Sequence, residues 1–215
     1  MNPARHTILN NIRQSYGRNE LAPQTIKTLK ARLASASAHE QPALGQALIP
    51  KFIKQLEKVA STLENIPHAK EIPFAILEFL QQHDLPKKMV VDSHLKGLPW
   101  PNKLHLAFRA ANANDVVSVS HAFAGIAETG SLVLLSSPES PTTLNFLPSN
   151  HIVVLHKNDL VAHIEDVWTR LRAQSMPRTV NFITGPSRTA DIEQTIQLGA
   201  HGPRRLHVIF AEKYL

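Results

Sequence analysis

Apolar residues recur at steps of three and four through the first part of the chain, up to about residue 85, and this spacing predicts helices. The clearest apolar stripe begins near Leu48 and runs to Leu63, with lysines and a glutamate on its other side. We expect this helix to end before Pro67, because proline cannot continue a helix. Shorter helical patterns lie around residues 8–16, 26–33 and 74–80.

From about residue 88 the pattern changes to short apolar runs, which predict strands. An amphipathic pattern from Leu160 to Leu171 predicts a helix among them, with Asn158 or its neighbour as the cap. A further short helix is expected at residues 189–198. Strands that alternate with helices predict an α/β fold, a three-layer sandwich around a mostly parallel sheet. The expected strands are residues 89–91, 104–108, 116–119, 131–135, 152–155, 180–183 and 206–210.

The composition is that of a globular protein, with 43% hydrophobic and 19% charged residues in a chain of 215. No apolar run approaches the roughly 20 residues that a membrane-spanning helix needs. The start of the chain lacks the basic and apolar regions of a secretory signal, so we expect a cytoplasmic location. We divide the chain into a helical N-terminal segment, residues 1–70, and an α/β domain, residues 71–215.

The absence of cysteine excludes disulfides, thiolate zinc sites and cysteine-ligated iron–sulfur clusters in this chain. Any redox metal must therefore belong to a partner. The net charge of +6 and the pI near 9.7 raise the question of nucleic-acid binding. The basic residues are scattered, however, without a run of five and without interleaved aromatic residues. We therefore expect a solvated basic face and no nucleic-acid partner.

A glycine- and proline-containing loop follows the expected strand at residues 180–183 and opens the expected helix after it. Gly185 permits an unusual turn, and Ser187 or Thr189 can cap the helix. The exposed N–H groups together with Arg188 can bind a carboxylate or a phosphate. The alternative is that Ser187 is only a cap, and the spacing alone does not decide between the two.

A second loop, residues 199–205, leads into the last expected strand. Gly199 is explained as the C-cap of the preceding helix. His201 lies before Gly202 and can donate to an anion or transfer a proton, although most single histidines do neither. We place His201 and Gly202 among the candidate site residues.

A third candidate segment contains Glu128, Thr129 and Gly130 at the start of an expected buried strand. Burying a carboxylate there costs free energy unless it has a partner, so Glu128 is the best acid–base or nucleophile candidate. The alternative is a glutamate satisfied by backbone N–H groups or by Arg188. The histidines lack a metal-binding spacing, and hydrolase, P-loop and dinucleotide fingerprints are missing, so we predict no metal site.

Four segments together resemble the lactate utilization protein C (LutC/YkgG) family, whose common unit is the LUD domain. The resemblance covers residues 70 to 213, and Ser131 departs from it where the family often has threonine. It implies a sheet like that of the NagB/RpiA/CoA-transferase fold. It also implies a role in oxidising L-lactate to pyruvate with two iron–sulfur partner proteins. The segments are residues 127–134, 147–154, 185–193 and 199–203.

Three functions stay open at this point. The leading one is a subunit of an L-lactate-oxidising system, without a cofactor of its own, in which Arg188 and nearby amides hold a small carboxylate or a partner's acidic group. The second is an independent acyl- or CoA-transferase-like enzyme in which Glu128 attacks a thioester. The third is a regulatory module that senses an organic acid without turnover.

Overall fold

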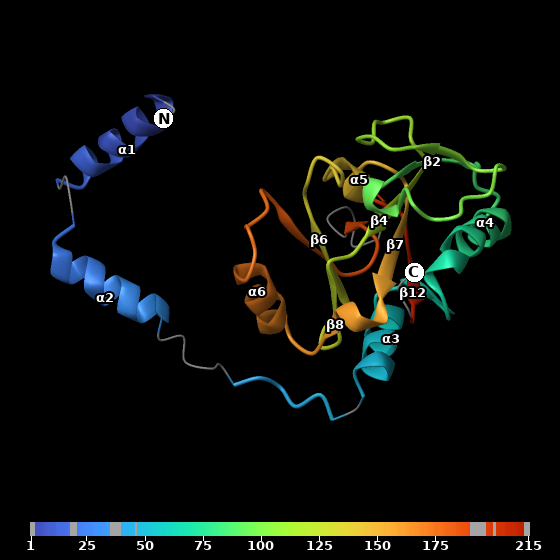
Figure 1. The fold of residues 1–215 in the computed structure, drawn as a ribbon, viewed down its shortest axis with the longest axis horizontal. Helices are drawn as coiled ribbons and strands as arrows, with labels where there is room; N and C mark the ends of the chain where they lie inside the picture. The colour runs from blue at the N-terminus through green and yellow to red at the C-terminus, as the bar shows by residue number, and fades with distance from the viewer. Residues whose placement is uncertain are drawn as a thin grey trace. The chain divides into compact units, whose positions relative to one another are not determined.

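In a computed structural model of the chain, the apolar runs form a six-stranded sheet in which all neighbouring strands are parallel (Figure 1). The strand order is β1-β12-β7-β4-β2-β3. Every residue of β7 is buried, as expected for a parallel strand that is covered on both faces. The strands are β1 (Thr62–Ile66), β2 (Lys88–Val91), β3 (His105–Ala107), β4 (Val117–His121), β7 (Asn150–His156) and β12 (Arg205–Ala211).

A second sheet of four strands has the order β8-β5-β6-β9. Its β5–β6 and β6–β9 pairs are antiparallel, whereas β5 and β8 are parallel. The strands are β5 (Ala124–Ile126), β6 (Ser131–Leu135), β8 (Leu160–Val161) and β9 (Val180–Ile183). The structure describes residues 3–17, 21–34, 40–45, 47–189, 197–199 and 201–212.

Side chains that alternate along β7 build two cores on opposite faces of the parallel sheet. Ile152 and Val154 pack with helix α4 on one face. Val153 and Leu155 pack with helix α3 and with strand β6 on the other. Helix α6 covers the far face of the four-stranded sheet. The helices are α3 (Leu48–Lys58), α4 (Ile72–Gln82), α5 (Thr143–Phe146) and α6 (Ile164–Arg172), with 3-10 turns at Ala69–Glu71, Ser93–Leu95 and Lys157–Asp159.

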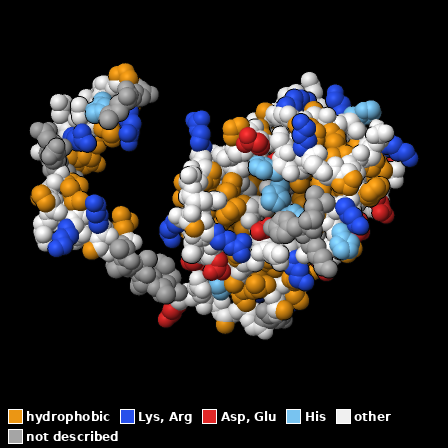
Figure 2. All heavy atoms as spheres, viewed as in Figure 1, with side chains coloured by type: hydrophobic (Ala, Val, Ile, Leu, Met, Phe, Trp, Pro, Cys, Tyr) orange, Lys and Arg blue, Asp and Glu red, His pale blue; other side chains and the backbone are white. Residues whose placement is uncertain are grey.

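The chain divides into two compact units, Met1–Pro42 and Ala43–Leu215. The first unit contains helices α1 (Pro3–Ser15) and α2 (Pro23–Ala34), and α1 has no buried residue. Figure 2 shows apolar and basic side chains on both helices. This division falls before the predicted one at residue 70, because α3 and β1 contribute to the cores of the second unit.

The predicted α/β class with a mostly parallel sheet is confirmed, and β6 and β9 have the predicted bounds. The predicted helix from Leu48 to beyond Leu63 is wrong in its second part, because α3 ends at Lys58. Ala60 adopts a left-handed backbone with φ of 56°, and the N–H of Ser61 returns to the carbonyl of Leu56. This turn redirects the chain into β1, which pairs with β12.

Two other helix predictions were wrong in part. Leu160 and Val161 form β8 instead of a first helical turn, and α6 begins only at Ile164. The N–H of His163 donates to Asp166 Oδ2 at 2.9 Å, so the cap lies here and not at Asn158. A helix was expected at residues 189–198, but the two ends of this range are strands. They are β10 (Arg188–Thr189) and β11 (Gln197–Leu198), which pair antiparallel. The middle of the range, residues 190–196, lies outside the described residues.

Candidate functional site

Two of the predicted motifs meet at one end of the four-stranded sheet, where the turn between β5 and β6 lies beside the end of β9. The hydroxyl oxygen of Thr129 lies 2.7 Å from that of Ser131. The Ser131 hydroxyl in turn lies 2.6 Å from Thr184 Oγ1. Three linked hydroxyl groups therefore join the 127–134 segment to the loop that begins at Gly185.

Two predicted glycines in these motifs pack closely against α3 and its C-terminal end. Gly130 has φ of +72°, and a Cβ there would lie 2.9 Å from the backbone nitrogen of Leu56. Gly185 has φ of +86°, and a Cβ there would lie 2.7 Å from the carbonyl oxygen of Val59. Both the backbone conformation and the close approach require glycine. Packing against α3 therefore explains these two glycines without a ligand.

The two predicted loops at residues 185–188 and 199–203 lie against each other. The Ser187 N–H donates to the carbonyl of Pro203 at 2.8 Å, and the Gly199 N–H donates to the carbonyl of Ser187 at 2.9 Å. A Cβ on Gly202 would lie 3.2 Å from Ser187 Cβ, so the two residues are in close contact. The Arg204 N–H donates to the carbonyl of Ser149 at 2.8 Å, so the loops lie at the amino ends of β7 and β12.

A cavity of about 250 Å³, which we call the motif pocket, opens between these loops and α5. Four predicted site residues line it, namely Gly185, Ser187, His201 and Gly202. His201 is exposed at the surface, and Ser187 is half-buried. The other lining residues are Asn145, Phe146, His151, Phe182, Ile183, Thr184, Pro186, Pro203 and Leu206.

One wall of the motif pocket carries a buried hydrogen-bond chain that the sequence analysis missed. Ser120 Oγ donates to Asn145 Oδ1 at 3.2 Å, and His151 Nε2 lies 2.9 Å from the same hydroxyl. Burial lowers the pKa of His151 to about 3, so the ring is neutral and donates through Nε2. His151 belongs to the 147–154 segment that carries the resemblance, but no spacing shows that its ring meets Ser120.

The remaining predicted residues lie elsewhere. Glu128 Oε2 lies 2.9 Å from His163 Nδ1, and the Glu128 carboxylate does not line the motif pocket. Arg188 is exposed and forms no ion pair with the described residues, so the predicted alternative of a Glu128–Arg188 pair is not formed. Thr189 lies in β10, and its side chain is outside the described part of the chain.

The described ranges also bear on metal binding and on membrane-spanning helices. No group of three or more histidine, aspartate or glutamate residues there is placed to bind a metal ion. The helices described in this structure include none long and apolar enough to cross a membrane.

Comparison with protein families and curated proteins places this geometry in context. Residues 49–211 match the family model of the LUD domain. An uncharacterized protein of Neisseria meningitidis is 31% identical over 137 residues, which are 62% of this chain and 59% of that protein. A lactate utilization protein C of Anoxybacillus flavithermus is 37% identical over 78 residues, 36% of each chain. The alignments thus span less than two thirds of these two relatives.

Longer alignments exist at lower identity. A lactate utilization protein C of Halalkalibacterium halodurans is 25% identical over 236 aligned positions, which cover 97% of both chains. A crystal structure of a DUF162 family protein from Deinococcus radiodurans matches with a TM-score of 0.58 and 19% identity. That match covers 80% of this chain and 99% of the other, and it shows a shared fold.

Proposed function

Because the chain belongs to the LUD domain family, we propose that it acts in lactate utilization, as one subunit of a system that oxidises L-lactate to pyruvate. Several relatives carry the name lactate utilization protein C. In this role the chain binds the carboxylate of a small organic acid in the motif pocket. The fold similarity alone does not support this role, because one fold serves many functions.

The observation that supports the proposal most is the convergence of separate sequence segments on one pocket. The segments at 147–154, 185–193 and 199–203 each contribute at least one lining residue of the motif pocket. Its volume of about 250 Å³ suits a ligand smaller than the drug-sized molecules that fill larger sites. The Ser187 hydroxyl and a ring N–H of His201 are the groups that donate to the carboxylate in this proposal.

Partner proteins supply the redox centres in the proposed system. Oxidation of lactate releases electrons and protons, and the electrons need an acceptor. The chain has no cysteine with which to ligate an iron–sulfur cluster. We therefore assign the clusters to two iron–sulfur partner proteins, which accept the electrons.

The sequence left two ligands open for Arg188, a small carboxylate and an acidic group of a partner. Its side chain is exposed and is not among the residues that line the motif pocket. An exposed charged group adds little free energy to a screened contact, but it directs the approach of an opposite charge. We propose that Arg188 contacts an acidic group of a partner.

The acyl-transfer alternative has less support. A glutamate that attacks a thioester must face the bound substrate, but the Glu128 carboxylate is held by His163 at 2.9 Å. The Glu128 carboxylate is not among the groups that line the motif pocket, and Gln55 donates to the backbone carbonyl of Glu128 at 2.7 Å. Glu128 stays a predicted acid–base residue without a substrate beside it.

Calorimetric titration of L-lactate and pyruvate into the full chain tests the pocket. We expect saturable binding to the wild type and loss of at least tenfold in affinity for Ser187→Leu, whose larger side chain fills the pocket. Ser15→Leu, on the exposed helix α1, is the matched control and keeps the wild-type affinity. Flat titrations of the wild type with both acids, or equal affinities in the two variants, would remove the carboxylate site from the proposal.

A further inference from the structure

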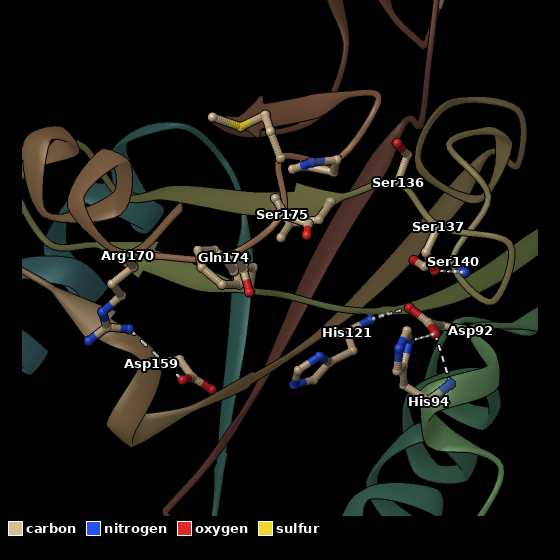
Figure 3. Close-up of a pocket in the computed structure, with 14 residues that line it drawn as sticks. Asp92, His94, His121, Ser136, Ser137, Ser140, Asp159, Arg170, Gln174 and Ser175 are labelled. Atoms are coloured by element: carbon tan, nitrogen blue, oxygen red, sulfur yellow. Dashed lines mark hydrogen bonds and ion pairs between the residues drawn. The ribbon is translucent and has the colours of Figure 1, made fainter. Parts of the chain in front are cut away.

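A second cavity, which we call the carboxyl-edge cavity, has a volume of about 720 Å³ (Figure 3). It lies where three strands end: Asp92 follows β2, His121 ends β4, and Leu135 ends β6. Ligands of open parallel sheets bind beyond the carboxyl ends of the strands. The four sequence segments that resemble the LUD family contribute none of its lining residues. The cavity is therefore separate from the motif pocket.

One side of the cavity holds a histidine that a buried aspartate fixes in place. Asp92 is 1% exposed, and its Oδ1 lies 2.7 Å from His94 Nδ1 and accepts the backbone N–H of His94 at 2.9 Å. Asp92 Oδ2 accepts the backbone N–H of His121 at 3.3 Å. Because His94 donates through Nδ1, its Nε2 carries a lone pair in the neutral ring. The His94 side chain is 55% exposed, so this acceptor is available to a ligand.

Serine hydroxyl groups on the same side can donate to a ligand. Ser136 Oγ accepts the backbone N–H of Thr179 at 2.9 Å. Ser137 Oγ accepts the N–H groups of Glu139 and Ser140 at 3.1 and 3.0 Å. Since each oxygen already accepts a backbone donor, each hydroxyl hydrogen can point to a ligand oxygen. A ligand hydroxyl can therefore accept from a serine and donate to the histidine.

The opposite side of the cavity carries a guanidinium and a carboxylate. Figure 3 shows Arg170 and Asp159 across the cavity from Asp92 and His94. Arg170 Nη1 lies 4.0 Å from Asp159 Oδ1, which is the outer limit of an ion pair. The guanidinium has five N–H donors, so it keeps donors for a bound carboxylate. The negative charge of Asp159 beside it disfavours a ligand with more than one charge.

Apolar side chains complete the lining of this cavity, namely those of Phe123, Leu135 and Met176. We propose that the carboxyl-edge cavity binds an elongated organic monoacid, with its carboxylate at Arg170, an apolar body, and a hydroxyl group at His94 and the serines. Lactate is too small to reach both sides of such a cavity. This inference is independent of the proposed role in lactate utilization.

Three related probes test the two ends of the ligand by calorimetry on the full chain. 3-(4-Hydroxyphenyl)propionate has both polar ends, 3-phenylpropionate lacks the hydroxyl, and tyramine has an ammonium in place of the carboxylate. We expect saturable binding of the first and about tenfold weaker binding of the second, the loss that one or two neutral hydrogen bonds explain. Tyramine should bind at least tenfold more weakly than the first acid, because its ammonium cannot accept the N–H groups of Arg170.

Two variants test which residues bind the carboxylate and the hydroxyl group of the ligand. Arg170→Gln should weaken both acids about tenfold or more, while Arg172→Gln, on an exposed position of the same helix, should leave them unchanged. His94→Ala should reduce the affinity for the hydroxylated acid to that for 3-phenylpropionate, while His105→Ala, also exposed, should not. Circular dichroism confirms the fold of each variant.

The probe comparison uses the wild type alone, so it holds even when a variant does not fold. The proposal is overturned when neither acid shows saturable binding. Equal affinity for the three probes overturns it as well, because neither end is then recognised. Lactate binding at the motif pocket is measured separately with Ser187→Leu, so failure of one site is distinguishable from failure of the other.

Discussion

At the scale of single residues, packing against α3 explains two motif glycines without a bound ligand. Gly130 and Gly185 both have positive φ, and a Cβ on either residue would lie 2.9 or 2.7 Å, respectively, from a backbone atom of α3 or its C-terminal end. We predict that Gly130→Ala and Gly185→Ala each lower the free energy of unfolding by about 1–3 kcal/mol. Gly97→Ala, where nothing lies within 4 Å, is the control in urea unfolding. Equal stability of Gly130→Ala and Gly97→Ala would contradict the packing account.

Buried histidines predict a loss of stability in acid. Burial lowers the pKa of His207 to about 4 and that of His151 to about 3. Above pH about 6.5 both rings are neutral in the folded and the unfolded chain. As the pH falls below that value, the two histidines bind protons in the unfolded chain but stay neutral in the folded chain. The free energy of unfolding then falls by up to about 1.4 kcal/mol per pH unit for each ring, down to their folded pKa values.

Urea unfolding between pH 7 and pH 4.5 measures this effect. His207→Gln should lose less stability with falling pH than the wild type, because it lacks one of the two buried histidines whose pKa is lowered in the folded chain. His105→Gln, at an exposed position of β3, should keep the wild-type slope. Identical slopes for His207→Gln and the wild type would show that His207 does not contribute.

The sequence predicted the site residues that lie in short local motifs and missed those brought together by the sheet. Gly185, Ser187, His201 and Gly202 lie in two loops separated by one short segment, so turn chemistry was enough to find them. Asp92 and His121 are far apart in sequence and meet because β2 pairs with β4. A polar residue at the end of one strand and another just after a second strand were the available signal, but strand order was needed to use it.

At the scale of elements, the periodic patterns predicted the parallel strands of the six-stranded sheet except β1, and they predicted the junctions poorly. The error at α3 is instructive, because Leu63 continues the helical spacing while it lies in β1. A left-handed residue at Ala60, which no propensity rule expects of alanine, separates the two elements. The helix expected at residues 189–198 is wrong at its two ends, where Thr189 pairs with Gln197 and Leu198 pairs with Arg188 as antiparallel strands.

Helix α3 is an integral part of the α/β unit in this account. Phe52 is fully buried against β7 and β12 side chains. We predict that Phe52→Ala lowers the free energy of unfolding by about 3–5 kcal/mol. Ile8→Ala, in α1 where the side chain is 59% exposed, should change it by less than about 0.5 kcal/mol. Similar small changes at both positions, measured by chemical denaturation, would place α3 outside the core.

At the scale of the whole molecule, the division after Pro42 predicts two independent parts. The free energy of unfolding of a chain that begins at Ala43 should equal that of the full chain within about 0.5 kcal/mol, because α1 buries no residue. Thermal and urea unfolding of the two chains gives the comparison. A large loss of stability in the shorter chain would show that the first unit supports the second.

The central claim, that the chain works in lactate oxidation with redox partners, is tested most directly by L-lactate-dependent dye reduction. The assay compares the complex that co-purifies with the chain from its native host with the chain purified alone. We predict activity in the complex, none in the lone chain, and reduced activity in a complex that carries Arg188→Ala. An inactive complex from which no iron–sulfur partner is recovered would contradict the account and favour a sensing or acyl-transfer function.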